Sequence, residues 1–71
     1  MEEYQKRVIA EKAELDLKII KLATFIHSDK FDNISAKKQD ILYHQLTVMM
    51  EYSKSLCMRM DSFKSTFTLT N

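Results

Sequence analysis

The hydrophobic residues in the second half of the chain recur at alternating intervals of four and three residues. A side chain every 3.5 residues lies on one face of an α-helix, so this spacing predicts one long helix. Its apolar stripe consists of Leu42, Leu46, Met49, Leu56, Met60, Phe63 and Phe67, with Ser53 at the remaining position. One helix cannot bury such a stripe by itself, so the pattern also requires a partner helix.

The first half of the chain repeats the pattern and predicts a helix over residues 3–27. Its stripe consists of Tyr4, Val8, Leu15, Ile19, Leu22 and Ile26, with Glu11 as the one poor fit. A second apolar row flanks the stripe and contains Ile9, Ala13, Leu17, Ile20 and Ala23. The combined apolar arc is wider than one partner helix needs.

Residues 28–35 interrupt the periodicity and form a polar connector. Its two apolar residues, Phe31 and Ile34, are expected to close the end of a hairpin. Ser35 is the expected N-cap of the second helix, over residues 36–64, because its hydroxyl can accept a free backbone N–H; Asp32 or Asn33 would serve if the helix began earlier. Residues 65–71 alternate polar and apolar side chains, which fits either a short strand or a frayed end with Phe67 docked.

A short connector makes the two helices antiparallel neighbours. The expected facing pairs are Ile26 with Leu42, Leu22 with Leu46, Ile19 with Met49, Leu15 with Ser53, Val8 with Met60, and Tyr4 with Phe63. Glu11 would then face Leu56 or Cys57. The sequence thus predicts an all-α fold in which residues 1–71 form a single domain, a coiled-coil-like antiparallel two-helix hairpin.

The small size of the chain limits how much apolar surface the hairpin can bury. With 71 residues, no Gly and no Pro, a two-helix chain has little interior of its own. The second helix also has apolar residues away from its stripe, namely Ile41, Val48 and Tyr52 on one side and Tyr43, Met50 and Cys57 on another. These cannot all face the first helix, so the sequence predicts a homo-oligomer.

Charge and motifs narrow the range of functions. Eleven basic and ten acidic residues give a net charge of +1, which argues against a DNA or RNA polymer as the main partner. No apolar run is long enough to span a membrane. The acidic N-terminus and the single cysteine, Cys57, favour a soluble protein of the cytoplasm.

No residue pattern indicates catalysis, a cofactor or a metal. His27, His44 and Cys57 are too far apart in the sequence to predict a metal site, and no glycine-rich loop is present to hold a phosphate. A structural role is the simpler interpretation of all three residues. We therefore expect a protein that is not an enzyme and that uses no cofactor.

The N-terminal polar cluster is the most suggestive feature. It comprises Tyr4, Gln5, Lys6 and Arg7, followed by Glu11, Lys12 and Lys18. An aromatic ring with nearby cations can stack on a base and hold phosphates. The alternative is a solvated helix start with Tyr4 covering the end of the core. If several subunits bring these ends together, they would form a shared pocket for an anionic ligand.

The sequence resembles a known family in both helices. The matching stretches are Tyr4-Gln5-Lys6-Arg7-Val8, Glu11 to Asp16, Lys18-Ile19, Lys21-Leu22 and Phe25-Ile26, then Gln45-Leu46, Met49, Tyr52, Leu56, Arg59-Met60 and Phe63. They resemble short phage helical-hairpin proteins, specifically the hairpin domain shared by phage anti-CBASS and anti-Thoeris signal sponges. The anti-Thoeris sponges carry a further β-rich region, so the resemblance implies an ADP-ribose-type pocket that is either missing here or reduced to the alternating tail.

The resemblance implies a function. Members form homo-oligomers, often hexamers, which trap a cyclic di- or trinucleotide or a cyclic ADP-ribose isomer in the bacterial host cytoplasm without cleaving it. By position, the residues that the resemblance implies as ligand-binding are Tyr4, Gln5, Arg7, Glu11, Lys12 and Lys18, with Arg59 as a further candidate. The alternative function is a hairpin that binds another phage or host protein and takes no small-molecule ligand.

Overall fold

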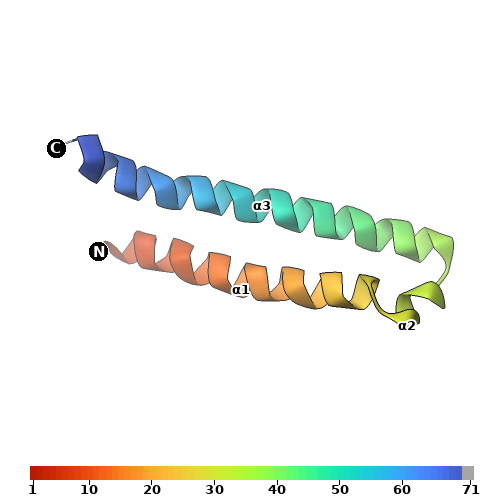
Figure 1. The fold of residues 1–71 in the computed structure, drawn as a ribbon. Helices are drawn as coiled ribbons and strands as arrows, with labels where there is room; N and C mark the ends of the chain where they lie inside the picture. The colour runs from red at the N-terminus through yellow and green to blue at the C-terminus, as the bar shows by residue number, and fades with distance from the viewer. Residues whose placement is uncertain (70–71) are drawn as a thin grey trace.

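The computed structural model describes the backbone of residues 1–69 and the side chains of residues 1–63. In this part of the chain, α1 spans Glu3–Ile26, α2 spans Asp29–Asp32 and α3 spans Ala36–Leu69. Figure 1 shows α1 and α3 lying antiparallel, with α2 turning the chain at the closed end of a rod. The rod measures 54 × 16 × 15 Å. The predicted all-α fold with two long antiparallel helices is confirmed.

The helix bounds differ from the expected ones at three places, the first being that α1 ends at Ile26, one residue early. The connector contains the short helix α2, and α3 continues to Leu69 instead of ending at 64. The strand, one of the two alternatives for the tail, is therefore wrong for residues 65–69. Residues 70–71 and the side chain of Phe67, on which the other alternative depends, lie outside the described residues. No Gly or Pro interrupts this stretch, so each added residue can extend the helix by one backbone hydrogen bond.

Phe31 closes the hairpin at the α2 end, as the sequence predicted. Its side chain is 4% exposed. Its ring meets Phe25 edge-to-face at 6.2 Å and Tyr43 edge-to-face at 5.3 Å between centroids, the geometry that aromatic pairs prefer. One ring from each of the three helices therefore meets at this end.

The backbone of the connector is held by residues at the start of α3. Gln39 Nε2 donates to the carbonyl oxygens of Phe31 at 2.9 Å and Ile34 at 3.3 Å. The hydroxyl of Ser35 accepts a hydrogen bond from the Lys38 backbone N–H at 3.3 Å. This is the bond of an N-cap residue, so the expected cap is confirmed.

The apolar seam between α1 and α3 is thin. Four side chains among the described residues are buried: Val8, Ile26, Phe31 and Leu56. Most other members of the two stripes are half-buried. At the open end Tyr4 packs edge-to-face on Phe63, with ring centroids 5.6 Å apart, which confirms the predicted pairing of these two residues.

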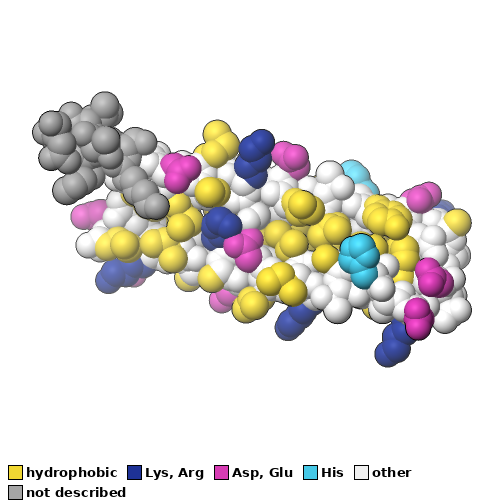
Figure 2. All heavy atoms as spheres, in the orientation of Figure 1, with side chains coloured by type: hydrophobic (Ala, Val, Ile, Leu, Met, Phe, Trp, Pro, Cys, Tyr) yellow, Lys and Arg dark blue, Asp and Glu magenta, His cyan; other side chains and the backbone are white. Residues whose placement is uncertain are grey.

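Much apolar surface remains uncovered in the single chain. The face drawn in Figure 2 carries hydrophobic side chains along the middle of the rod, with most charged groups toward its edges. The large apolar residues that are exposed are Met1, Tyr4, Leu17, Ile20, Ile41, Tyr43, Val48, Met50, Tyr52 and Met58. An apolar surface of this extent on a small protein usually marks a site of association.

Leu56, which is 1% exposed, should be the residue of the seam that tolerates truncation least. We expect Leu56→Ala to lower the free energy of unfolding by about 2–5 kcal/mol, the range for buried leucines. Met58→Ala, at a position that is 63% exposed, is the control and should unfold near the wild type. Urea denaturation followed by circular dichroism measures both variants; equal midpoints would show that the seam does not hold the hairpin together.

Candidate functional site

Two flanks run along the rod, one on each side of the apolar seam. Consecutive helical residues point about 100° apart, so Glu11 and Lys12 project to opposite flanks, as do Tyr52 and Ser53 of α3. Hydrogen bonds across the seam link Lys12 with Ser53 and Tyr52 with Glu11. We name the two sides the Ser53 flank and the Tyr52 flank.

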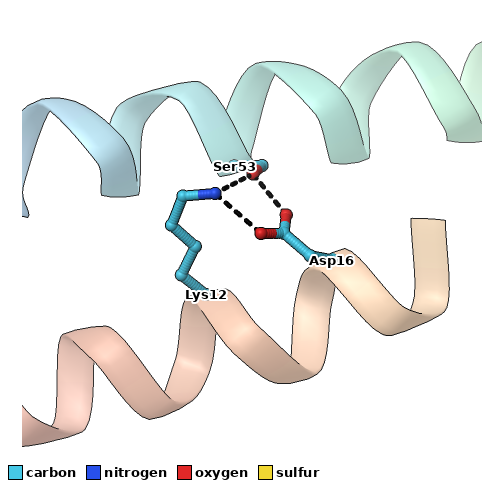
Figure 3. A network of polar contacts seen from close by, with 3 residues as sticks. All are labelled: Lys12, Asp16 and Ser53. Atoms are coloured by element: carbon cyan, nitrogen blue, oxygen red, sulfur yellow. Dashed lines mark hydrogen bonds and ion pairs between the residues drawn. The ribbon is translucent and has the colours of Figure 1, made fainter. Parts of the chain in front are cut away.

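On the Ser53 flank, three side chains form a closed polar network, drawn in Figure 3. Lys12 Nζ lies 2.7 Å from Asp16 Oδ2 and 3.1 Å from Ser53 Oγ. The Ser53 hydroxyl donates to Asp16 Oδ1 at 2.6 Å. The hydrogen bond with Lys12 lowers the pKa of Asp16, helped by the bond from Ser53, and the same contact with Asp16 raises the pKa of Lys12.

The sequence did not reveal this network. Ser53 was interpreted as a small residue facing Leu15, whereas its hydroxyl bridges Lys12 and Asp16. The available signal was the four-residue spacing of Lys12 and Asp16, which places opposite charges on neighbouring turns of a helix. The spacing alone does not show that the Lys12–Asp16 pair lies against the other helix.

An open groove of about 380 Å³ lies over this network. It is lined by Lys12, Asp16 and Ile19 of α1 and by Met50, Ser53, Lys54 and Cys57 of α3. The volume is near the lower end of the range for small-molecule sites. Lys12 is the one predicted ligand residue in its lining, and its charge is already compensated by Asp16.

On the Tyr52 flank, the hydroxyl of Tyr52 donates to the carboxylate of Glu11. This hydrogen bond raises the pKa of Tyr52, while the charge of nearby Arg59 acts in the opposite direction. The expectation that Glu11 faces Leu56 or Cys57 is corrected, because its carboxylate reaches a hydroxyl instead of entering the apolar seam. Two predicted ligand residues, Glu11 and Arg59, therefore gather around Tyr52.

Arg7 and Lys18 belong to the same flank. They lie four residues before and seven residues after Glu11 in α1, spacings that return a side chain to the same side of a helix. Both are exposed, as is Arg59. Within residues 1–63, none of these three cations takes part in an ion pair, so their charges are available to an anion.

The two remaining predicted residues lie at the start of α1. Tyr4 packs on Phe63 but keeps 48% of its surface exposed. Gln5 Oε1 accepts a hydrogen bond from the Glu2 backbone N–H at 3.0 Å, so its carbonyl group caps the helix. The structure thus brings Arg7, Glu11, Lys18 and Arg59 to one flank, and separates Lys12 and Gln5 from them.

The described part of the chain offers neither a metal cluster nor a membrane span. His27 and His44 are exposed, and no group of three or more His, Cys, Asp or Glu side chains in residues 1–69 could hold a metal ion. Among the same residues, no helix is long and apolar enough to cross a bilayer.

The lowered pKa of Asp16 predicts a pH dependence of stability. The stabilisation that ionised Asp16 provides is complete at pH values above the pKa of an aspartate in the unfolded chain, about 4. It is lost as the pH falls through the pKa of Asp16 in the folded chain. We expect acidification from about pH 7 to pH 3 to lower the denaturation midpoint less in Asp16→Asn than in the wild type. Glu14→Gln, an exposed acid of the same helix, is the control and should follow the wild type; an unchanged acid response in Asp16→Asn would contradict the prediction.

Comparison with known proteins places the chain in a family. Residues 2–62 match the model of a family named Sequestin. The chain is 41% identical over 61 residues to an uncharacterized 7.5 kDa protein of the denB–rIIB intergenic region of Enterobacteria phage T4, covering 86% of this chain and 95% of that protein. No solved structure matches. The match extends over both long helices, and the chain therefore belongs to the Sequestin family.

Proposed function

We propose that the protein is a phage anti-defence sponge, which binds cyclic nucleotide messengers in the cytoplasm of the bacterial host and withholds them from their immune effectors. The family name, Sequestin, denotes sequestration, and the phage T4 relative supports a phage role. The observation that carries the proposal is the group of three exposed cations on the Tyr52 flank, Arg7, Lys18 and Arg59, without ion-pair partners among the described residues.

The chemistry of this flank suits a cyclic di- or trinucleotide or a cyclic ADP-ribose isomer. Each such ligand combines phosphate groups with one or more bases. Arg7 and Arg59 can hold phosphate oxygens by two parallel hydrogen bonds, and Lys18 adds a compact positive charge. Tyr4, at the open end, keeps enough exposed ring to stack on a base. Glu11 keeps Tyr52 in place beside Arg59.

A single hairpin presents these groups on a convex rod, which encloses little of a ligand. Small-molecule sites usually bury most of the ligand surface. We therefore propose that a bound messenger brings the cationic flanks of two copies together around it, so that the walls of each site come from more than one chain. The exposed apolar side chains of the single chain support such an assembly.

Sequestration differs from catalysis in what happens to the ligand. Ion pairing and stacking hold a phosphodiester without activating a nucleophile against it. The proposal therefore requires that the messenger be bound stoichiometrically and released intact when the protein is denatured.

Calorimetric titration with cyclic dinucleotides, cyclic trinucleotides and cyclic ADP-ribose isomers tests this function. We expect a dissociation constant below about 10 µM for at least one of them. Arg7→Ala and Lys18→Ala should each weaken binding by about tenfold, the value of one charge-assisted hydrogen bond. Lys37→Ala removes an exposed cation at the other end of the rod and should bind like the wild type.

Two results would contradict the proposal: no binding of any of these messengers, or recovery of a cleaved ligand in mass spectrometry. The second candidate function is an interaction module for another phage or host protein, which the exposed apolar residues also favour. A stoichiometric protein partner that is still captured by the Arg7→Ala and Lys18→Ala variants would support that candidate.

A further inference from the structure

Helix α3 exposes apolar side chains on both flanks. Residues seven apart lie on one side of a helix, so Tyr43 and Met50 share the Ser53 flank with Cys57. Ile41 and Val48 share the Tyr52 flank by the same rule. All four of the large apolar side chains are about half exposed, so α3 alone does not distinguish the two flanks.

Helix α1 does distinguish them. On the Ser53 flank, Ile19 lines the groove and Ile20, one turn after Asp16, is 60% exposed. On the Tyr52 flank, α1 presents the charged residues Arg7 and Lys18. The Ser53 flank therefore has apolar side chains on both helices, and its α1 charges, Lys12 and Asp16, are paired with each other. On the Tyr52 flank, the α1 cations Arg7 and Lys18 have no ion-pair partner among the described residues.

The Ser53 flank is also hollowed. The groove of about 380 Å³ has Ile19, Met50 and Cys57 in its wall, together with groups of both charge signs. We propose that this flank is the docking surface for a second copy of the chain. The two copies would be related by a two-fold axis, with the Ser53 flank of one against the Ser53 flank of the other. The inference goes beyond messenger binding and holds whether or not a ligand is bound.

Charge supports a second copy as the occupant. Lys54 lines the groove and has no ion-pair partner within residues 1–63. The Asp16 carboxylate accepts bonds from Lys12 and Ser53 and can accept further ones. In a two-fold pair each position meets its counterpart reciprocally, so the free cation of one copy can reach the carboxylate of the other.

The area of the Ser53 flank also matches that of a stable interface between two chains. A rod 54 Å long and 15 Å thick offers about 800 Å² on one side, the area that each partner contributes to a standard stable interface. Such a contact would cover the groove and Cys57, and would leave Arg7, Lys18 and Arg59 on the opposite flank. The pairing that needs no ligand and the contact around a bound messenger would then use different sides of the hairpin.

A matched pair of substitutions tests the docking surface. Met50→Asp and Val48→Asp place the same charge on α3 two residues apart, at positions 55% and 51% exposed, but on opposite flanks. In sedimentation experiments without ligand, we expect Met50→Asp to reduce the assembled protein to the 8.4 kDa chain, and Val48→Asp to leave the pair of copies intact. Circular dichroism confirms that both variants remain helical.

Reactivity of the natural cysteine provides a second measurement that needs no substitution. Cys57 is exposed in the single chain, so a docked second copy should protect its thiol from an alkylating reagent, and Met50→Asp should remove the protection. The inference is overturned by an unprotected Cys57 in the assembled protein. It is also overturned if Val48→Asp dissociates the assembly as completely as Met50→Asp does, or if the wild type sediments as a single chain.

Discussion

The apolar seam between α1 and α3 is the contact on which the rest of the structure depends, and it is a thin one. Four side chains of the described residues are buried, while most of the remaining stripe is half-covered by one partner helix. Apart from α2 at the closed end, no further element of the described chain encloses the core between the two long helices. Because folded proteins are only marginally stable and small chains bury a small share of their surface, the assembly proposed above would supply the additional burial.

Polar contacts near the middle of the rod give the apolar seam a register. The Lys12–Asp16–Ser53 network and the Glu11–Tyr52 bond lie on opposite flanks at about the same height. An apolar seam built of heptads would pack almost as well if one helix were shifted by seven residues along the other. Such a shift would oppose Asp16 with an apolar residue, which is costly for a charge. The polar contacts thereby also fix Arg59 on the flank of Arg7 and Lys18, where the proposed ligand would bind.

The fold could be predicted because periodicity reports which side chains face another helix; the Tyr4–Phe63 contact and the position of Phe31 followed from it directly. The candidate site could be predicted less well. The spacing of apolar residues marks Ser53 only as a small residue of the seam and Glu11 only as a polar residue out of place. It does not show that a side chain on the other helix forms a hydrogen bond with each of them. The extension of α3 to Leu69 was missed because alternation in a short segment also fits a helix that nothing interrupts.

In the proposed assembly, the hairpin is held together in part by other copies of itself. The most direct test is the dependence of the thermal unfolding midpoint on protein concentration, because a fold stabilised by association must melt at a higher temperature when more protein is present. We expect a midpoint that rises steadily with protein concentration. A midpoint that stays constant, for a helical particle of 8.4 kDa, would contradict it.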